Sequence, residues 1–128
     1  MRLLLDTSTL IWWTLDHPAI SRRVHEAILD PGNDKLVSAV SAMEITTKVR
    51  NGKLPEAEEL AATFEAVLAD QGFSELPLLV GHGRLAGNMR GSHKDPFDRM
   101  LAAQAIIENL ALLSSDAALD QFGVQRFW

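Results

Sequence analysis

The 128 residues (14.1 kDa) suit one compact domain spanning residues 1–128, and a hydrophobic content of 47% is too high for a disordered chain. No apolar run approaches the ~18 residues that a membrane-spanning helix needs, and the absence of cysteine excludes disulfides, thiolate metal sites and a cysteine nucleophile, so a cytoplasmic setting is expected. The net charge of −5 lacks the basic excess of most non-specific nucleic-acid binders, although carboxylates that hold metal ions would have their charge cancelled locally.

The first half of the chain alternates short apolar runs with helix-forming segments, which end at proline, glycine or turn-forming residues. The expected strands lie at residues 3–5 and 35–40. The expected helices lie at 11–15, from an N-cap at Ser21 to about Leu29, and from Ser41 to near Asn51.

The second half of the chain continues the same alternation. The expected helices lie at 56–70, at 78–89, from an N-cap at Asp95 to about Asn109, and at 116–122. The expected strands lie at 73–76, 110–113 and 124–127. Strands that alternate with helices predict an α/β fold with a parallel sheet covered on both faces.

Four acidic residues fall beside the predicted strand ends and helix starts. Right-handed β-α-β connections begin each helix at the carboxyl edge of a parallel sheet, where ligands gather in open α/β folds. Asp6 follows the first strand, and Asp116 lies just beyond the strand at 110–113. Glu44 and Asp98 each lie in the first turn of a predicted helix. All four carboxylates are therefore expected to project from one edge of the sheet.

Converging carboxylates predict a site for a hard divalent cation such as Mg²⁺, which prefers oxygen ligands and is often shared with substrate phosphates. Two ions about 3.5–4 Å apart could stabilise both the attacking and the leaving oxygen of a phosphodiester displacement. No side chain is a convincing general base, so water activated by the ions is the expected nucleophile. The reaction class predicted in this way is a metal-dependent nuclease.

Helix capping alone would account for three of the four acids. Ser41 and Glu44 match the capping box Ser-x-x-Glu. Capping is also the simplest role for Asp98 and Asp116 near the starts of their helices. Asp6 is harder to explain structurally, because an acid that ends a buried strand is costly unless it has a partner.

Two basic segments lie near these acids in the sequence. Lys48 stands four residues after Glu44, where an ion pair worth roughly 0.3 kcal/mol and a contact with a substrate phosphate are equally reasonable roles. His93 and Lys94 could touch a nucleic-acid backbone, but a solvated loop is the preferred interpretation.

Small polar and aromatic residues complete the candidates. Ser8 and Ser114 stand two residues from Asp6 and Asp116, where they could orient carboxylates or waters or simply cap turns. Trp12 and Trp13 are adjacent, so at most one faces the core squarely and the other is expected to mark an interface.

Four blocks of sequence, in order through the whole chain, resemble the PIN domain, and in particular the VapC-like ribonucleases of toxin–antitoxin pairs. These are Leu-Leu-Leu-Asp-Thr-Ser (3–8), Val-Ser-Ala-x-Ser-x-x-Glu-Ile (37–45), His-Lys-Asp-Pro-Phe-Asp-Arg-Met-Leu-Ala-Ala-Gln-Ala (93–105) and Leu-Leu-Ser-Ser-Asp (112–116). A lone Asp-Thr-Ser is weak evidence, whereas the four blocks together are specific.

The resemblance implies a three-layer α/β/α sandwich with a central, mostly parallel sheet and an endoribonuclease that depends on Mg²⁺ or Mn²⁺. Its acidic residues fall on the same four positions, Asp6, Glu44, Asp98 and Asp116. It also places Ser8 and Ser114 beside the site, although a histidine is common in this sub-branch where the chain has Ser8. Asp95 belongs to the third block and resembles a capping or supporting acid.

The same resemblance implies partners. It implies an RNA substrate, a homodimer, and a small antitoxin protein that silences the enzyme by docking a helix near the site. The surface around Trp12 and Trp13 and the helix that begins at Glu56 are available for that contact.

Three other functions can be compared with the motifs of the chain. A haloacid-dehalogenase-like phosphatase would need a second acid two residues after Asp6, where Ser8 stands. A response-regulator receiver would need an acidic pair near the start and a lysine near the last strand, and the chain has neither. A catalytically inactive PIN-like module that binds RNA or protein remains the alternative, because retained ligands do not prove turnover.

Overall fold

A computed structural model describes all residues, 1–128, and contains a single sheet of five parallel strands. The spatial order is β3-β2-β1-β4-β5, so the chain adds strands on one side of β1 and then crosses to the other side. The strand bounds are β1 Arg2–Leu5, β2 Asp34–Ser38, β3 Ser74–Leu76, β4 Ala111–Leu113 and β5 Gln125–Phe127. The order of the strands therefore reverses between β1 and β4, which is where open α/β sheets bind ligands.

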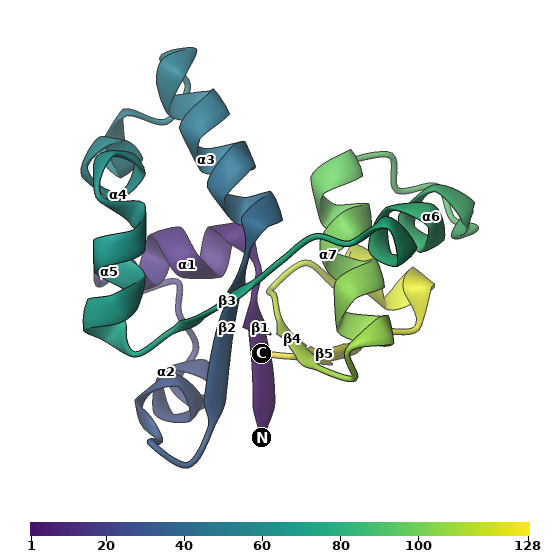
Figure 1. Cartoon of the computed structure of the whole chain (residues 1–128). Coiled ribbons are helices and arrows are strands. Elements are labelled where there is room, and N and C mark those ends of the chain that lie inside the picture. Colours follow the sequence, from purple (N-terminus) through teal and green to yellow (C-terminus); the bar gives the residue numbers. More distant parts are fainter.

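Helices cover both faces of the sheet, as Figure 1 shows with α1, α2, α4 and α5 on one side and α6 and α7 on the other. The α-helices are α1 Thr7–Thr14, α2 Arg22–Leu29, α3 Ala39–Arg50, α4 Glu58–Ala62, α5 Phe64–Gln71, α6 Val80–Asn88 and α7 Pro96–Ile107. Two 3-10 helices, η1 Pro55–Ala57 and η2 Ala117–Phe122, complete the fold. The predicted three-layer α/β/α fold is confirmed. No helix combines the length and the apolar character needed to cross a membrane.

Burial on both faces explains why the first strand reads as a continuous apolar run rather than an alternating one. Leu3 and Leu5 point into the larger core beneath α1, α2 and α5, whereas Leu4 points into the smaller core beneath α7. Leu113 and Leu112 of β4 divide between the same two cores. All five side chains are fully buried, and each contributes about 1.5–3 kcal/mol of transfer free energy.

The register of the three central strands brings their carboxyl ends to one level. Leu5 at the end of β1 pairs with Val37 on one side and with Leu113 on the other. The residues that follow these pairs, Asp6, Ser38 and Ser114, therefore sit side by side at the edge of the sheet. That edge is where the sequence predicted the acids to meet.

Two helices begin earlier than predicted, because Asp6 and Ser38 provide caps that were not predicted. The first helix was expected at 11–15, but Asp6 accepts a hydrogen bond from the backbone N–H of Thr9 at 2.8 Å and starts α1 at Thr7. The next strand was expected at 35–40, but Ser38 accepts from the N–H of Val40 at 2.9 Å and starts α3 at Ala39. Asp6 directly follows β1 and Ser38 is the last residue of β2, so each helix starts without an intervening loop.

The single helix predicted at 56–70 was wrong, because the structure divides it into η1, α4 and α5. The break between α4 and α5 lies at Thr63, which has non-helical dihedral angles (φ −128°, ψ 36°). The Thr63 hydroxyl donates to the carbonyl of Glu59 at 2.9 Å, and such back-bonding bends helices. The helix expected at 116–122 is the 3-10 helix η2.

A buried amide connects α7 to the start of α3. Gln104 of α7 is fully buried, and its Oε1 accepts a hydrogen bond from the Ser38 hydroxyl at 2.6 Å. Its Nε2 donates to the carbonyl of Pro77 at 3.2 Å. Since Ser38 is the N-cap of α3, this one side chain links the start of α3 to α7 and to the segment that leaves β3.

Candidate metal centre

Asp6 lies at the carboxyl end of the central strand and is only 8% exposed. Its Oδ1 accepts from the Thr9 N–H, so the same carboxylate caps α1 and faces the edge of the sheet. The Thr9 hydroxyl donates to the carbonyl of Leu113 at 2.8 Å, which fastens the first turn of α1 to the neighbouring strand. The partner that a buried acid at this position needs is therefore the start of its own helix.

Glu44 is not a helix cap. Ser38 caps α3, and Ser41 lies inside the helix, fully buried, with its hydroxyl 3.0 Å from that of Thr7. The predicted capping box of Ser41 and Glu44 was wrong, because the helix begins two residues before Ser41 and Glu44 lies in its second turn. Helix capping is thereby removed as an explanation for this acid.

The Glu44 carboxylate is buried, at 5% exposed, and only half satisfied. Its Oε2 lies 2.5 Å from the Nζ of Lys48, so the ion pair considered from the spacing is present. Its Oε1 is the only buried side-chain polar atom of the chain without a hydrogen-bond partner. An unsatisfied buried carboxylate oxygen is costly, and it fits an oxygen that awaits a cation.

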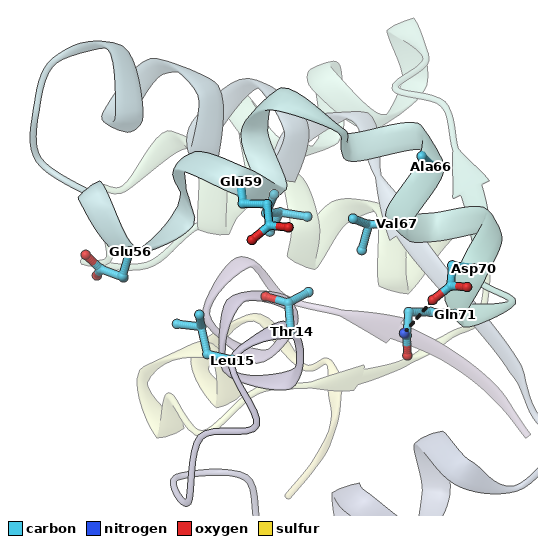
Figure 2. Close-up of a pocket in the computed structure, with 9 residues that line it drawn as sticks. Thr14, Leu15, Glu56, Glu59, Ala66, Val67, Asp70 and Gln71 are labelled. Carbon is cyan, nitrogen blue, oxygen red and sulfur yellow. Dashed lines mark hydrogen bonds between the residues drawn. The ribbon is translucent and has the colours of Figure 1, made fainter.

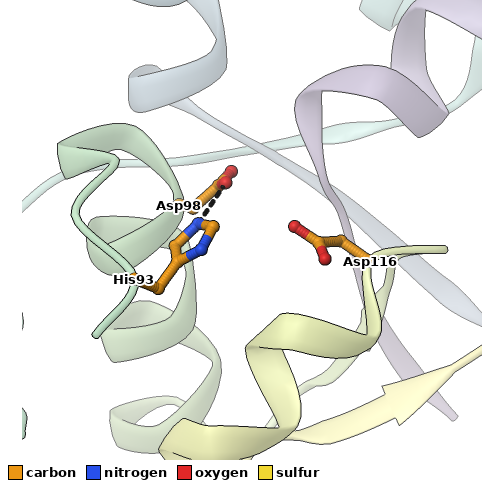
Figure 3. Close-up of side chains that lie close together, drawn as sticks. All are labelled: His93, Asp98 and Asp116. Atoms are coloured by element: carbon orange, nitrogen blue, oxygen red, sulfur yellow. Dashed lines mark hydrogen bonds and ion pairs between the residues drawn. The ribbon is translucent and has the colours of Figure 1, made fainter. Parts of the chain in front are cut away.

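Asp98 and Asp116 come together with a histidine that the sequence analysis had assigned to a solvated loop. The Nε2 of His93 lies 2.8 Å from Oδ2 of Asp98. One potential ligand atom from each of His93, Asp98 and Asp116 lies within 4.8 Å of the other two. Figure 3 shows the three side chains directed toward one another from the loop before α7, from α7 and from the start of η2.

Burial and mutual repulsion act on two of the acids. Desolvation by burial raises the pKa of Asp6, while hydrogen bonds from Ser114 and Thr9 oppose the shift and the charge of Glu44 adds to it. Desolvation also raises the pKa of Asp98, with the His93 hydrogen bond lowering it and the charges of Asp95 and Glu44 raising it again. Glu44 therefore acts on both Asp6 and Asp98, which places the three carboxylates in one electrostatic cluster.

The four predicted acids form two overlapping sets. Asp6, Glu44 and Asp98 are coupled through their charges, whereas Asp98 and Asp116 share the group with His93. Asp98 belongs to both. Asp116 is exposed and also caps η2, with its carboxylate accepting from the N–H of Ala118 at 3.0 Å.

The supporting residues have different surroundings. Ser114 is buried, favours the charged form of Asp6, and accepts a hydrogen bond from the backbone N–H of Asp116 at 3.1 Å, so it touches two of the acids. Asp95 caps α7 through the N–H groups of Phe97 and Asp98. Ser8 is exposed and makes no side-chain hydrogen bond within the chain.

The donor set fits a divalent cation. Carboxylate oxygens are the preferred ligands of Mg²⁺ and Mn²⁺, and an ion would neutralise the repulsion among carboxylates that Lys48 and His93 offset only in part. The unpartnered oxygen of Glu44 supports this fit.

Sequence reasoning missed two polar contributions. Thr7 and Thr9 hold the first turn of α1 against α3 and β4, which the adjacency of Asp6 and Thr7 in the first block could have suggested. His93 precedes Asp98 by five residues in the block His-Lys-Asp-Pro-Phe-Asp. Its imidazole reaches Asp98 because the loop before α7 turns back onto that helix, and the sequence alone does not indicate this turn.

A groove separate from the four candidate metal ligands lies between the end of α1 and the helices α4 and α5 (Figure 2). It has a volume of about 410 Å³. Apolar side chains form part of its lining, and three acids stand around it: Glu56, Glu59 and Asp70. Trp13 packs against the adjacent core and donates its indole N–H to Gln71, another lining residue, at 2.9 Å.

Comparison with known proteins gives one family and several structural relatives. The family model of the PIN domain matches residues 3–125. No curated protein matches the chain. The following comparisons with solved structures concern proteins less than 25% identical to the chain, so they show the fold alone.

Three of these structures cover nearly the whole chain. VapBC2 from Rickettsia felis, solved bound to a DNA fragment from their promoter, is 17% identical with a TM-score of 0.69 over 95% of this chain and 93% of that chain. FitAcB from Neisseria gonorrhoeae is 22% identical with a TM-score of 0.69 over 98% and 96%. VapBC-1 from nontypeable Haemophilus influenzae is 16% identical with a TM-score of 0.68 over 100% and 96%.

Proposed function

The chain belongs to the PIN domain family, whose members are generally nucleases, and we propose that it is an endoribonuclease that depends on Mg²⁺ or Mn²⁺. The observation that carries the proposal is the buried carboxylate of Glu44, one oxygen of which has no hydrogen-bond partner in the chain. If the four acids served only the stability of the fold, replacing them with uncharged residues would be expected to increase the free energy of unfolding.

Each acid has a defined part in the proposed reaction. Asp6 and Asp98 are the main metal ligands, with Glu44 completing the buried end of the site and Asp116 the exposed end. When bound, a divalent ion polarises the scissile phosphate, activates water and stabilises the leaving oxygen. Ser114 orients the Asp6 carboxylate, and the turns at Thr7 and Thr9 keep that carboxylate fixed relative to β4.

In this proposal the RNA binds on the side of the site where Lys48 and Asp116 are accessible to solvent. The Lys48 side chain is 44% exposed, so its ammonium can reach solvent and a phosphate while remaining on the face of α3 that carries Glu44. Asp116 lies at the exposed end of the acidic cluster, which leaves that end accessible to an extended phosphodiester chain.

The test is cleavage of a pool of total tRNA and rRNA by the purified protein with Mg²⁺, with Mn²⁺ and with EDTA. Asp6→Asn is the inactive variant, and Glu26→Gln on the exposed face of α2 is the matched control for loss of one acid. Discrete fragments from the parent and the control, absent with EDTA and with Asp6→Asn, support the proposal. Metal-independent cleavage, or cleavage that survives Asp6→Asn, contradicts it.

The groove in Figure 2 supports a second part of the proposal, that the enzyme is the toxin of a toxin–antitoxin pair. Its apolar lining residues Leu15, Leu60 and Val67 fit the apolar face of a helix, and the acids around it fit basic residues on the same helix. We infer that a basic amphipathic segment of a small antitoxin protein occupies this groove and silences the enzyme.

A designed lysine-rich amphipathic peptide provides the probe for this contact, with binding measured by isothermal titration calorimetry. Its counterpart with glutamate in place of lysine is the charge control. Binding of the basic peptide that is lost in Glu59→Lys supports the docking surface, whereas equal binding of both peptides contradicts it.

We also infer a homodimer. Five large apolar side chains remain exposed around the start of α6 and the end of α7, namely Leu78 (41%), Leu79 (56%), Val80 (89%), Ile106 (40%) and Ile107 (47%). The two ends are adjacent, because Nε2 of His82 near the start of α6 lies 2.9 Å from the carboxylate of Glu108, directly after α7. Light scattering should give a dimer for the parent and a monomer for Val80→Lys; a monomeric parent would contradict the inference.

A further inference from the structure

The loop between α6 and α7 holds His93 in a fixed position at the edge of the acidic cluster. Arg99 of α7 reaches back over this loop and donates from Nη1 to the carbonyl of His93 at 2.8 Å. The same guanidinium donates to the carbonyl of Ala86 at 3.0 Å and to that of Met89. One arginine thus fastens the end of α6 and the loop to the helix that carries Asp98.

The other side of the loop packs against η2. The backbone N–H of His93 donates to Oε1 of Gln121 at 3.2 Å, and its ring meets the ring of Phe122 edge to face at a centroid distance of 6.2 Å. Gly91 has φ 150°, and a Cβ atom there would lie 2.4 Å from Gln121 Oε1 and 2.9 Å from Phe122 Cε1. Only glycine allows the loop to come this close, so the position of the imidazole is set from both sides.

The imidazole is directed at the carboxylates rather than at solvent. Its side chain is 20% exposed, and its Nε2 is the ring atom beside Asp98 Oδ2. Two ligands at right angles around an ion, each at about 2.1 Å, are about 3.0 Å apart. The observed separation of 2.8 Å between Nε2 and Oδ2 is close to that value, and the ligand atom of Asp116 also lies within 4.8 Å.

From this geometry, and resting on the proposed function, we propose that His93 is a metal ligand that supplies a nitrogen through Nε2 beside Asp98 and Asp116. In the bound state the imidazole is neutral, with its proton on Nδ1 and the Nε2 lone pair directed at the ion, so the hydrogen bond between Nε2 and Asp98 is replaced by shared coordination. The Glu44 oxygen without a partner is the independent sign that the cluster awaits a cation.

A nitrogen ligand changes which ion the site prefers. Mg²⁺ favours oxygen ligands throughout, whereas imidazole binds transition-metal ions more readily. The site is therefore expected to prefer Mn²⁺ to Mg²⁺, and His93 is expected to contribute to that preference. Removal of a single ligand or its close support changes metal affinity by about 10–100-fold.

The test is pulsed electron paramagnetic resonance of the Mn²⁺-loaded protein, which detects nitrogen nuclei directly bound to the ion. Calorimetry gives the Mn²⁺ and Mg²⁺ affinities of the same samples. His93→Gln keeps a hydrogen-bond donor near Asp98 but removes the imidazole nitrogen. His25→Gln on the exposed side of α2 is the control for loss of a histidine elsewhere.

We expect histidine nitrogen coupling in the parent and in His25→Gln, and its loss in His93→Gln. The Mn²⁺ affinity of His93→Gln should fall by about tenfold or more, with a smaller change in its Mg²⁺ affinity.

Mn²⁺ that binds without nitrogen coupling, or coupling that persists in His93→Gln, would overturn the proposal. Metal binding that is abolished by Asp6→Asn would in that case leave the proposed nuclease site standing. Absence of any Mn²⁺ or Mg²⁺ binding in the parent would overturn both. Thermal unfolding without metal shows whether each variant is folded.

Discussion

Lys48 neutralises only one of the two carboxylate oxygens of Glu44. The Nζ and Oε2 atoms lie 2.5 Å apart on one face of α3, while Oε1 is buried without a partner. The ammonium group of Lys48 therefore pairs with one carboxylate oxygen, and the other oxygen remains free to bind a second cation. Lys48 can then either stay with Glu44 or turn to a phosphate when an ion takes its place.

Lys48→Ala tests the second role. If the ammonium contacts one phosphate in the complex, the slope of log K against log salt for RNA binding should decrease by about 1. The measurement is RNA binding by the Asp6→Asn protein, which should not cleave, with and without the second substitution across a salt series. An unchanged slope would leave Lys48 as an ion pair within the helix.

Asp6→Asn should raise the free energy of unfolding at neutral pH in the absence of metal. Burial raises the pKa of Asp6 above its ordinary value of 3.8, so the ionised carboxylate destabilises the folded state. This penalty is complete above the folded pKa and disappears as the pH falls below the unfolded value. The side-chain oxygen of asparagine can still cap α1, so only the charge is lost.

Denaturant unfolding of both proteins between pH 4 and neutrality checks this expectation. The stability gain of Asp6→Asn should shrink as the pH falls, and Mn²⁺ should stabilise the parent but not the variant. Equal stability at neutral pH would show that the charge of Asp6 is already compensated without metal.

Asp98→Asn and Asp95→Asn separate ligation from capping in α7. Asparagine is as good an N-cap as aspartate, so Asp95→Asn should leave both the fold and RNA cleavage within a few-fold of the parent. Asp98→Asn removes a charged ligand and should reduce metal-dependent cleavage by about 100-fold or more. Cleavage rates at saturating Mn²⁺ decide the matter, and comparable activities of the two variants would remove Asp98 from the metal centre.

Gly91→Ala should disturb the site without touching an acid. The added Cβ would collide with Gln121 and Phe122, which costs about 1–3 kcal/mol and forces the His93 loop away from η2. Gly87→Ala is the matched control, because its Cβ meets nothing within 4 Å and alanine favours the helix α6. We expect lower stability and weaker Mn²⁺ binding for the first variant only; weakened binding in both would point to a general effect on α6.

The strands and the sheet edge could be predicted from the sequence because parallel strands that are buried on both faces appear as short continuous apolar runs. The run Leu3-Leu4-Leu5 and the acid that ends it locate β1, and handedness then places the other acids at the same edge. The cap of α7 at Asp95 was confirmed for a similar local reason, since aspartate before proline is a strong start signal.

The parts that could not be predicted depend on contacts distant in the chain. Ser38 and Ser41 are equally good caps by type, and the choice between them is made by the end of β2 and by the bond from Ser38 to Gln104, 66 residues away. His93 reads as an exposed loop residue until Arg99 and Gln121 fix the loop. The position of Asp116 in the group likewise depends on how η2 packs against that loop.

The amide of Gln104 has a consequence for how the acids respond to an ion. Gln104 lies in α7, which carries Asp98, and its side chain is hydrogen-bonded to Ser38, the N-cap of α3, which carries Glu44. One fully buried side chain therefore links the two helices. Neither helix can tilt toward a small ion without breaking that bond. The distance between these two carboxylates is therefore expected to be largely set before the proposed cation binds, so that little of its binding free energy is needed to bring the two helices together.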